Sequence, residues 1–291
     1  MLLVTFLFLL GLILGSAVNV VIARNKTAGK QNPKLSGKRS KCPHCGEVIA
    51  WYDNIPLLSF ILLKGRCRHC GKKISWQYPL VELVTALLVV GVLVLDFSAL
   101  SIKEIDITTM TGVGFAFWIF QLSCVFLMIG SLVAIFAYDL KHYLIPDRFV
   151  LVGVIATLIY NLLLDLNLVE TGLKPVSTGF LLNSATSSGF LGALIASGFF
   201  FCLVYFSKEK WMGWGDVKLA VFMGLVLGFP TILIGLFIAY LTGAVVGVSL
   251  LAFKKKKMKS EIPFGPFLCL GTYIALLFGR QIIVWYLKIM S

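Results

Sequence analysis

The run TGVGFAFWIFQLSCVFLMIGSLVAIFAYD fills residues 111–139 and carries one charged side chain, Asp139, at its very end. Roughly 20 consecutive apolar residues are enough for a helix to cross the hydrocarbon core of a bilayer. The apolar runs along the chain predict an all-α polytopic membrane protein with about eight transmembrane helices. The sixth is short and is joined to the seventh by a tight hairpin. The expected spans are 1–23, 80–97, 111–137, 149–166, 179–206, 217–229, 231–253 and 264–287.

The overall composition agrees with a membrane protein. Hydrophobic residues make up 59% of the 291 positions and charged residues 13%, whereas soluble domains are about half apolar and about a quarter charged. The first run has no basic region before it and no clear small-x-small cleavage site. We therefore expect a retained helix and not a signal peptide.

The net charge of +13 is concentrated in alternate connections between the apolar runs. The basic residues lie mainly at 24–73, 141–148, 208–218 and 254–259, twelve of them in the first segment. The other connections contain little besides Lys103 and Lys174. By the positive-inside rule, this alternation predicts four cytoplasmic loops and both termini outside. We therefore attribute the charge to topology and to contact with anionic membrane lipids, and we expect no nucleic-acid partner.

Residues 24–79 differ from the rest of the chain because they carry charge, turn residues and four of the seven cysteines. A unit of this size has room for only a small apolar core and often depends on a metal or a disulfide. We expect three parts: a first transmembrane helix over 1–23, a small zinc-stapled cytoplasmic insertion over 24–79, and a membrane domain over 80–291.

The insertion contains two CxxC pairs, CPHC at 42–45 and CRHC at 67–70. Two such pairs about twenty residues apart predict a structural, tetrahedral zinc site with four cysteine ligands. The predicted ligands are Cys42, Cys45, Cys67 and Cys70. His44 and His69 lie inside the pairs and are possible substitutes.

Two other interpretations compete with zinc. Disulfides are disfavoured in a reducing cytoplasmic loop, and thioredoxin-like chemistry needs one CxxC in a βαβ context that is absent from the sequence. The remaining cysteines, Cys124, Cys202 and Cys269, fall in apolar runs, where cysteine commonly acts as a small apolar side chain.

Few acids lie in or beside the apolar runs, and ionisable groups there are candidates for function. Asp139 ends one run, and Asp216 follows Gly213-Trp214-Gly215 where another begins. The predicted topology places both at cytoplasmic ends of spans, and glycines permit close backbone approach, so the two acids can meet. Of two neighbouring carboxylates, one acts as general base on a water while the other, protonated, polarises a carbonyl.

Each acid also has a plainer interpretation, as a solvated loop residue or a helix cap. Asp147, in Ile145-Pro146-Asp147, fits a helix start, and Glu82 fits either an interfacial residue or part of a site. The sequence has no Gly-x-Ser-x-Gly elbow, no H-E-x-x-H motif and only three histidines. A serine or cysteine triad and a zinc peptidase site are therefore disfavoured.

Taken together, these motifs resemble those of the bacterial type IV prepilin peptidases, a family of GxGD membrane aspartyl proteases, over nearly the whole chain. Ala17 departs from the family pattern, which commonly has a Phe there. The matching segments are Gly15-Ser16 with Asn19 to Arg24, Ser40 through Glu82 with both cysteine pairs, Asp139 through Asp147, and Gly213-Trp214-Gly215-Asp216.

The resemblance implies that Asp139 and Asp216 are the catalytic dyad of an aspartyl endopeptidase in the bacterial cytoplasmic (inner) membrane, with the active site facing the cytoplasm. It implies prepilin or pseudopilin substrates of type IV pilus, competence or type II secretion systems, cut after a glycine. It also implies N-methylation of the new N-terminus with S-adenosylmethionine. The sequence itself shows no glycine fingerprint for that cofactor.

Two alternatives stay open. One is a peptidase of this type without methyltransferase activity. The other is a zinc-stapled membrane transporter or scaffold whose acids move protons, although transporters place such acids near the bilayer midplane and Asp139 and Asp216 are expected at span ends. The sequence defines neither the individual substrate nor the oligomeric state.

Reporter tags test the predicted topology. Tags placed between Arg24 and Lys73 and after Lys259 should report the cytoplasm, and a tag after Ser291 should report the exterior, because basic loops are retained inside. Opposite locations for the first two tags would show that the eight-span topology is wrong.

Overall fold

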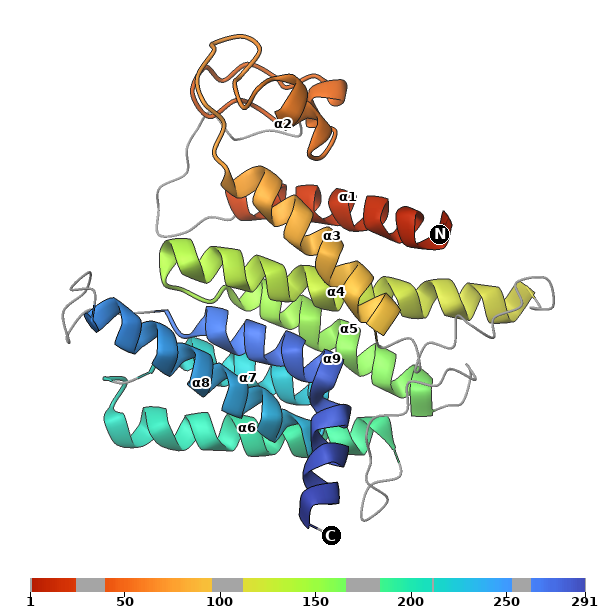
Figure 1. The fold of residues 1–291 in the computed structure, drawn as a ribbon, viewed down its shortest axis with the longest axis vertical. Coiled ribbons are helices and arrows are strands. Elements are labelled where there is room, and N and C mark those ends of the chain that lie inside the picture. The colour runs from red at the N-terminus through yellow and green to blue at the C-terminus, as the bar shows by residue number, and fades with distance from the viewer. Residues whose placement is uncertain are drawn as a thin grey trace. The chain divides into compact units, whose positions relative to one another are not determined.

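The computed structural model describes residues 2–24, 40–95, 112–165, 184–210, 212–252 and 263–290. Over these ranges the chain is helical, and its only β-pairing consists of two isolated bridges. The helices are α1 (Leu2–Arg24), η2 (Trp51–Asn54), α2 (Leu58–Leu62), α3 (Gln77–Leu95), α4 (Gly112–His142), α5 (Asp147–Asp165), α6 (Ala185–Ser207), α7 (Trp214–Leu227), α8 (Thr231–Ala252) and α9 (Gly265–Met290) (Figure 1).

The predicted all-α polytopic membrane fold is confirmed. Six described helices are long and apolar enough to cross a bilayer, and they cover Val4–Ala23, Trp118–His142, Asp147–Asp165, Ala185–Ser207, Thr231–Leu250 and Gly265–Met290. Gln77–Val92 is a shorter apolar helix. The helix α7 has 14 residues, about 21 Å at the usual rise, against a hydrocarbon core of about 30 Å. The count of eight spans therefore stays a prediction.

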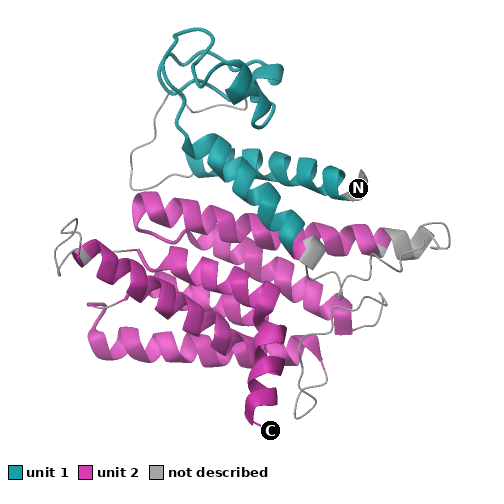
Figure 2. Ribbon diagram, viewed as in Figure 1, with its two compact units in different colours: residues 1–91 teal, residues 92–291 magenta. Residues whose placement is uncertain are grey.

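Several sequence predictions fall outside the described residues. These are the ends of some expected spans, the first part of the insertion (25–39), Lys103, Lys174, and the basic run at 254–259. The chain divides into two compact units, unit 1 at Met1–Gly91 and unit 2 at Val92–Ser291 (Figure 2). The expected three-part division at residues 23 and 79 groups segments by role and stays a prediction.

In unit 1, the apolar helices α1 and α3 approach closely through glycines. A Cβ added at Gly11 would lie 2.6 Å from the Cα of Ala86, and one added at Gly15 would lie 2.6 Å from the Cα of Glu82. The Asn19 side chain donates a hydrogen bond of 3.0 Å to the carbonyl of Tyr78. Small residues and interhelical hydrogen bonds of this kind are what drives helix association in membranes.

In unit 2, three helix pairs run side by side: α4 with α5, α6 with α7, and α8 with α9 (Figure 1). Gly224 of α7 lies against the α6 backbone, where an added Cβ would stand 2.3 Å from the Cα of Ala193. The buried Asn161 side chain of α5 donates to the carbonyl of Leu225 at 3.1 Å. Through these contacts α7 is held between α5 and α6, and it also packs against α9.

Replacing Gly224 by Ala should destabilise unit 2, because the new methyl group overlaps the α6 backbone. Overpacking of this kind costs about 1–3 kcal/mol. Gly198→Ala is the matched control, since a Cβ there meets no atom within 4 Å. Thermal unfolding in detergent should show a lower midpoint for Gly224→Ala and an unchanged or higher one for Gly198→Ala. Equal shifts would contradict the packing described above.

Candidate active site and metal centre

Asp139 lies in the last turn of α4, and its side chain is buried, with 4% of the residue exposed. The start of α9 covers it. The backbone amide of Gly265, the first residue of α9, donates a hydrogen bond to the Asp139 carboxylate. A Cβ added at Gly265 would stand 2.5 Å from Oδ2 of Asp139. A side chain at position 265 would therefore displace the Asp139 carboxylate from this position.

Asp216 is the third residue of α7 and is half-buried. Its carboxylate accepts a hydrogen bond from the backbone amide of Gly213, the N-cap residue of α7. Such a back-bond from the third helical position is half of a capping box, and it fixes the direction of the side chain. Asp216 lies close enough to Asp139 for the two carboxylates to interact electrostatically. The two acids, 77 positions apart in sequence, thus meet in the folded chain.

Ile145, in the short connection between α4 and α5, lies beside Gly215, which precedes Asp216, and beside Gly265, which covers Asp139. A Cβ added at Gly215 would be 3.2 Å from the Ile145 Cβ, and one added at Gly265 would be 3.4 Å from its Cδ1. No such crowding is seen at Gly213, where the nearest atom is 3.9 Å away. Of the two glycines before Asp216, it is therefore Gly215 that allows a close approach.

Two side chains that the sequence did not single out lie beside the acids. Tyr240 of α8 is near Asp216, and Cys269 of α9 is near both carboxylates. Tyr240 packs on Phe264, with ring centroids 5.1 Å apart. No sequence motif marks Tyr240, and Cys269 was expected to be an ordinary apolar residue. It is buried, as that expectation requires, but its neighbours are the two acids.

Asp147 starts α5, as its sequence context predicts. Its carboxylate is 72% exposed and pairs with Lys218 of α7 at 2.7 Å. An exposed ion pair of this kind contributes about 0–1 kcal/mol. Asp147 therefore joins the start of α5 to the first turns of α7, the helix that carries Asp216.

Glu82 of α3 is buried, with 8% exposed. Its carboxylate accepts a 2.9 Å hydrogen bond from the amide of Leu57 and another from the Ser16 hydroxyl. Leu57 has a positive φ of 57° and precedes α2. Glu82 therefore ties the insertion to helices α1 and α3, a role that the sequence left undecided.

The four predicted zinc ligands come together in unit 1. The sulfur atoms of Cys42, Cys45, Cys67 and Cys70 all lie within 4.8 Å of one another. The Sγ atoms of Cys42 and Cys70 are 3.9 Å apart, and a tetrahedral zinc with Zn–S bonds of 2.3 Å requires about 3.8 Å. No disulfide joins the seven cysteines, all of which lie in the described residues. The cluster fits a zinc ion.

Two matching turns build the cluster. In the first, the amide of Gly46 donates to the carbonyl of Cys42 at 2.9 Å, and a bridge joins Lys41 to Val48. In the second, the amide of Gly71 donates to the carbonyl of Cys67 at 2.9 Å, followed by a bridge between Arg66 and Lys73. The two CxxC segments therefore adopt the same local structure, although little sequence outside the motifs repeats.

The thiols of the cluster ionise unequally. The backbone amides of Cys70 and His69 lower the pKa of the Cys67 thiol to about 6. At Cys45, the amide of Glu47 lowers the pKa, but desolvation and the neighbouring thiols outweigh it and raise the pKa to about 11. Zinc binds thiolates, so binding must release protons, and its affinity falls as pH falls.

An ion pair supports the second turn. Arg68 makes two hydrogen bonds to Asp53 of η2, at 2.6 and 2.8 Å, and its guanidinium lies 5.4 Å from the ring centre of Tyr52. Hydrogen bonds from Arg68 lower the pKa of Asp53. Apart from the two charges themselves, no sequence motif indicates this pairing.

Comparison with known proteins identifies both halves of the chain. Residues 9–96 match the bacterial peptidase A24 N-terminal domain, and residues 124–248 match the type IV leader peptidase family. Proteins named prepilin leader peptidase/N-methyltransferase are similar over nearly the whole chain. The one from Aeromonas hydrophila is 33% identical over 97% of this chain and 93% of its own length. Those from Pseudomonas aeruginosa and Legionella pneumophila are 29% and 32% identical, over 96% and 86% of this chain. No solved structure matches significantly.

The helical membrane fold and these matches define the class as a multi-pass membrane peptidase. The chain belongs to the type IV leader peptidase family, and the resemblance stated from the sequence is confirmed.

Elemental analysis tests the metal centre. The purified protein should contain one zinc per chain, and Cys67→Ser should lose most of it because serine does not supply a thiolate. Cys202→Ser is the matched control, since Cys202 is an exposed thiol outside the cluster, and it should keep its zinc. Acidification should release the metal as the ligand thiolates take up protons. A native preparation without zinc would show that the assignment is wrong.

Proposed function

We propose that this protein cleaves the leader peptide of type IV prepilins or pseudopilins in the bacterial inner membrane and N-methylates the new N-terminus. The observation that carries the proposal is the meeting of Asp139 and Asp216, which come from the ends of two different helices in a member of this peptidase family. The similar proteins from Aeromonas and Pseudomonas carry both activities in their name.

In the proposed mechanism, Asp139 and Asp216 share the acid and base roles. The ionised carboxylate takes a proton from a water molecule whose oxygen attacks the scissile carbonyl carbon, and the protonated carboxyl donates a hydrogen bond to the carbonyl oxygen. The tetrahedral intermediate then collapses, and the leaving amine takes up a proton from the pair. The products are a leader with a new carboxyl group and a pilin with a free N-terminus.

The surrounding groups position the pair. The amide of Gly265 holds one side of Asp139, and the amide of Gly213 holds Asp216. These hydrogen bonds leave each carboxylate free oxygen positions for water and for substrate. We place the pair on the cytoplasmic side of the membrane because of the Lys and Arg alternation in the sequence.

The proposed function involves two cofactors, zinc and S-adenosylmethionine. The four cysteines would hold zinc as a closed structural site that stabilises the insertion and does not activate water. S-adenosylmethionine would supply the methyl group for the N-terminal amine. The described residues offer no glycine-rich turn between a strand and a helix to receive it, so we assign it no residues. A peptidase that lacks methyltransferase activity is the remaining alternative.

Asparagine variants test the catalytic pair. Asp139→Asn and Asp216→Asn should each abolish leader cleavage in a purified assay, because an amide has the same size but does not accept the proton of water. The double variant should be no worse than either single one if the acids act as a unit. Asp147→Asn is the matched control: it removes an exposed carboxylate from a neighbouring helix start and should reduce the rate only mildly.

Methylation provides a second readout. Both dyad variants should still methylate a pilin that has already been cleaved, which also shows that they are folded. Cleavage at a near wild-type rate by either folded variant would contradict the assignment. Wild-type protein that cleaves but transfers no methyl group would favour the peptidase-only alternative.

A further inference from the structure

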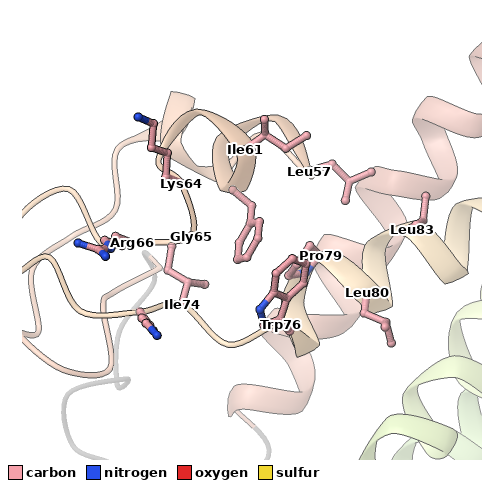
Figure 3. A pocket seen from close by; sticks show the side chains of 12 residues that line it. Leu57, Ile61, Lys64, Gly65, Arg66, Ile74, Trp76, Pro79, Leu80 and Leu83 are labelled. Atoms are coloured by element: carbon pink, nitrogen blue, oxygen red, sulfur yellow. The ribbon is translucent and has the colours of Figure 1, made fainter.

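The pocket found in unit 1 holds no carboxylate among its described residues. It has a volume of about 650 Å³ and opens between the insertion and the start of α3, where Phe60, Trp76 and Leu80 are part of its wall (Figure 3). None of the residues that line it is an acid. A further group that acts together with Asp139 and Asp216 therefore has to lie beside them, in unit 2.

Tyr240 carries a hydroxyl group near the middle of α8, an apolar helix. Thr242 and Ser249 of the same helix donate their hydroxyl hydrogens to backbone carbonyls four residues earlier, at 2.8 and 2.7 Å. The Tyr240 hydroxyl makes no hydrogen bond with any residue that the structure describes. A tyrosine hydroxyl in apolar surroundings usually has a partner, so this one is free to donate a hydrogen bond to a bound substrate.

Three phenylalanines hold the Tyr240 ring in place. Its centroid lies 5.1 Å from that of Phe264, which precedes α9. Phe200 of α6 stacks on it at 6.3 Å, and Phe199 meets it edge-on at 6.1 Å. Gly243, one turn later in α8, makes room for the Phe264 ring, since a Cβ there would be 3.2 Å from that ring. A ring held from several sides keeps its hydroxyl in one direction, which makes it a preorganised donor.

The same packing brings Tyr240 to the two acids. Phe264 is followed directly by Gly265, whose amide donates a hydrogen bond to the Asp139 carboxylate. Tyr240 also lies close enough to Asp216 to interact with its charge. The aromatic cluster around Tyr240 therefore adjoins both carboxylates.

The mechanism proposed above has a place for one more hydrogen-bond donor. The amides of Gly213 and Gly265 already donate to the carboxylates, so the scissile carbonyl oxygen receives a hydrogen bond from the protonated carboxyl alone. Cys269, the other neighbour of both acids, is 4% exposed, and an S–H group is a weak donor. Tyr240 is 36% exposed, and its O–H group is the stronger donor.

We propose that Tyr240 is a third catalytic residue of the leader peptidase reaction, an inference that rests on the proposed function. Its O–H group donates a hydrogen bond to the oxygen of the scissile carbonyl. When the water oxygen adds to the carbonyl carbon, the π electrons of the C=O bond move to that oxygen, which gains negative charge. When the intermediate collapses, the electron pair restores the C=O bond and the amine leaves with a proton from the two acids. Tyr240 keeps its own proton throughout.

Tyr240→Phe tests the proposal in the full-length, zinc-loaded protein with a prepilin as substrate. The variant keeps the ring and its packing and loses only the hydroxyl group. We expect kcat to fall on the order of a hundredfold at every pH while KM stays the same, because the lost hydrogen bond strengthens in the transition state. A leader peptide with a tetrahedral hydroxyethylene group in place of the scissile bond should inhibit the variant more weakly by a similar factor.

Tyr286→Phe is the matched control, since Tyr286 is 56% exposed near the far end of α9, and it should cleave like the wild type. An unchanged thermal unfolding midpoint in detergent shows that each variant is folded. An unchanged kcat in Tyr240→Phe, or a raised KM with an unchanged kcat, would overturn the proposal. So would a shifted pH optimum with the wild-type rate at the new optimum, because Tyr240 would then act through Asp216.

The asparagine variants of the two acids separate this proposal from the proposed function. If Asp139→Asn and Asp216→Asn are inactive while Tyr240→Phe is fully active, only the role of Tyr240 is wrong. If either folded asparagine variant cleaves at a near wild-type rate, the proposed mechanism fails and the role of Tyr240 fails with it.

Discussion

Burying a carboxylate inside a bundle of membrane helices costs free energy unless other groups donate hydrogen bonds to it. Asp139 is a carboxylate of this kind, with 4% of the residue exposed. The amide of Gly265, at the start of α9, donates a hydrogen bond to the Asp139 carboxylate, and a side chain at position 265 would displace that carboxylate. Helix packing in unit 2 brings Asp216 close to Asp139. Glycine-lined packing holds α7 against α6, so the first turn of α7 places Asp216 near Asp139. Ile145 packs beside both Gly215 and Gly265.

The insertion depends on a different constraint. It has little apolar core, and its four thiols converge to within 4.8 Å, where a metal ion would hold it together. Arg68 and Asp53 brace the second turn, and Glu82 connects the insertion to α1 and α3. The chemistry of the two acids and the stability of the insertion thus rest on separate groups.

Much of the helical fold and of the cysteine cluster could be predicted from the sequence. Long apolar runs, paired CxxC motifs and acids at span ends each have few physical explanations. The six long helices and the convergence of Cys42 with Cys70 followed from such patterns. The Gly265 contact did not, because a glycine at a helix start is common and only the fold shows what faces it. Tyr240 and the Arg66–Lys73 pair were missed for the same reason. Tyr240 has its neighbours in distant segments, and the pairing of Arg66 with Lys73 depends on the geometry of the turn between them.

The central claim is that two carboxylates activate water to cut a prepilin leader. Its most direct test is to incubate the purified, zinc-loaded protein with a prepilin in heavy-oxygen water containing hydroxylamine, and to weigh both fragments by mass spectrometry. We predict one cut, with the heavy oxygen in the new carboxyl group of the leader and no hydroxamate, because water attacks the peptide directly. An intact prepilin, or a leader hydroxamate that reveals an acyl-enzyme such as one on the nearby Cys269, would contradict the account.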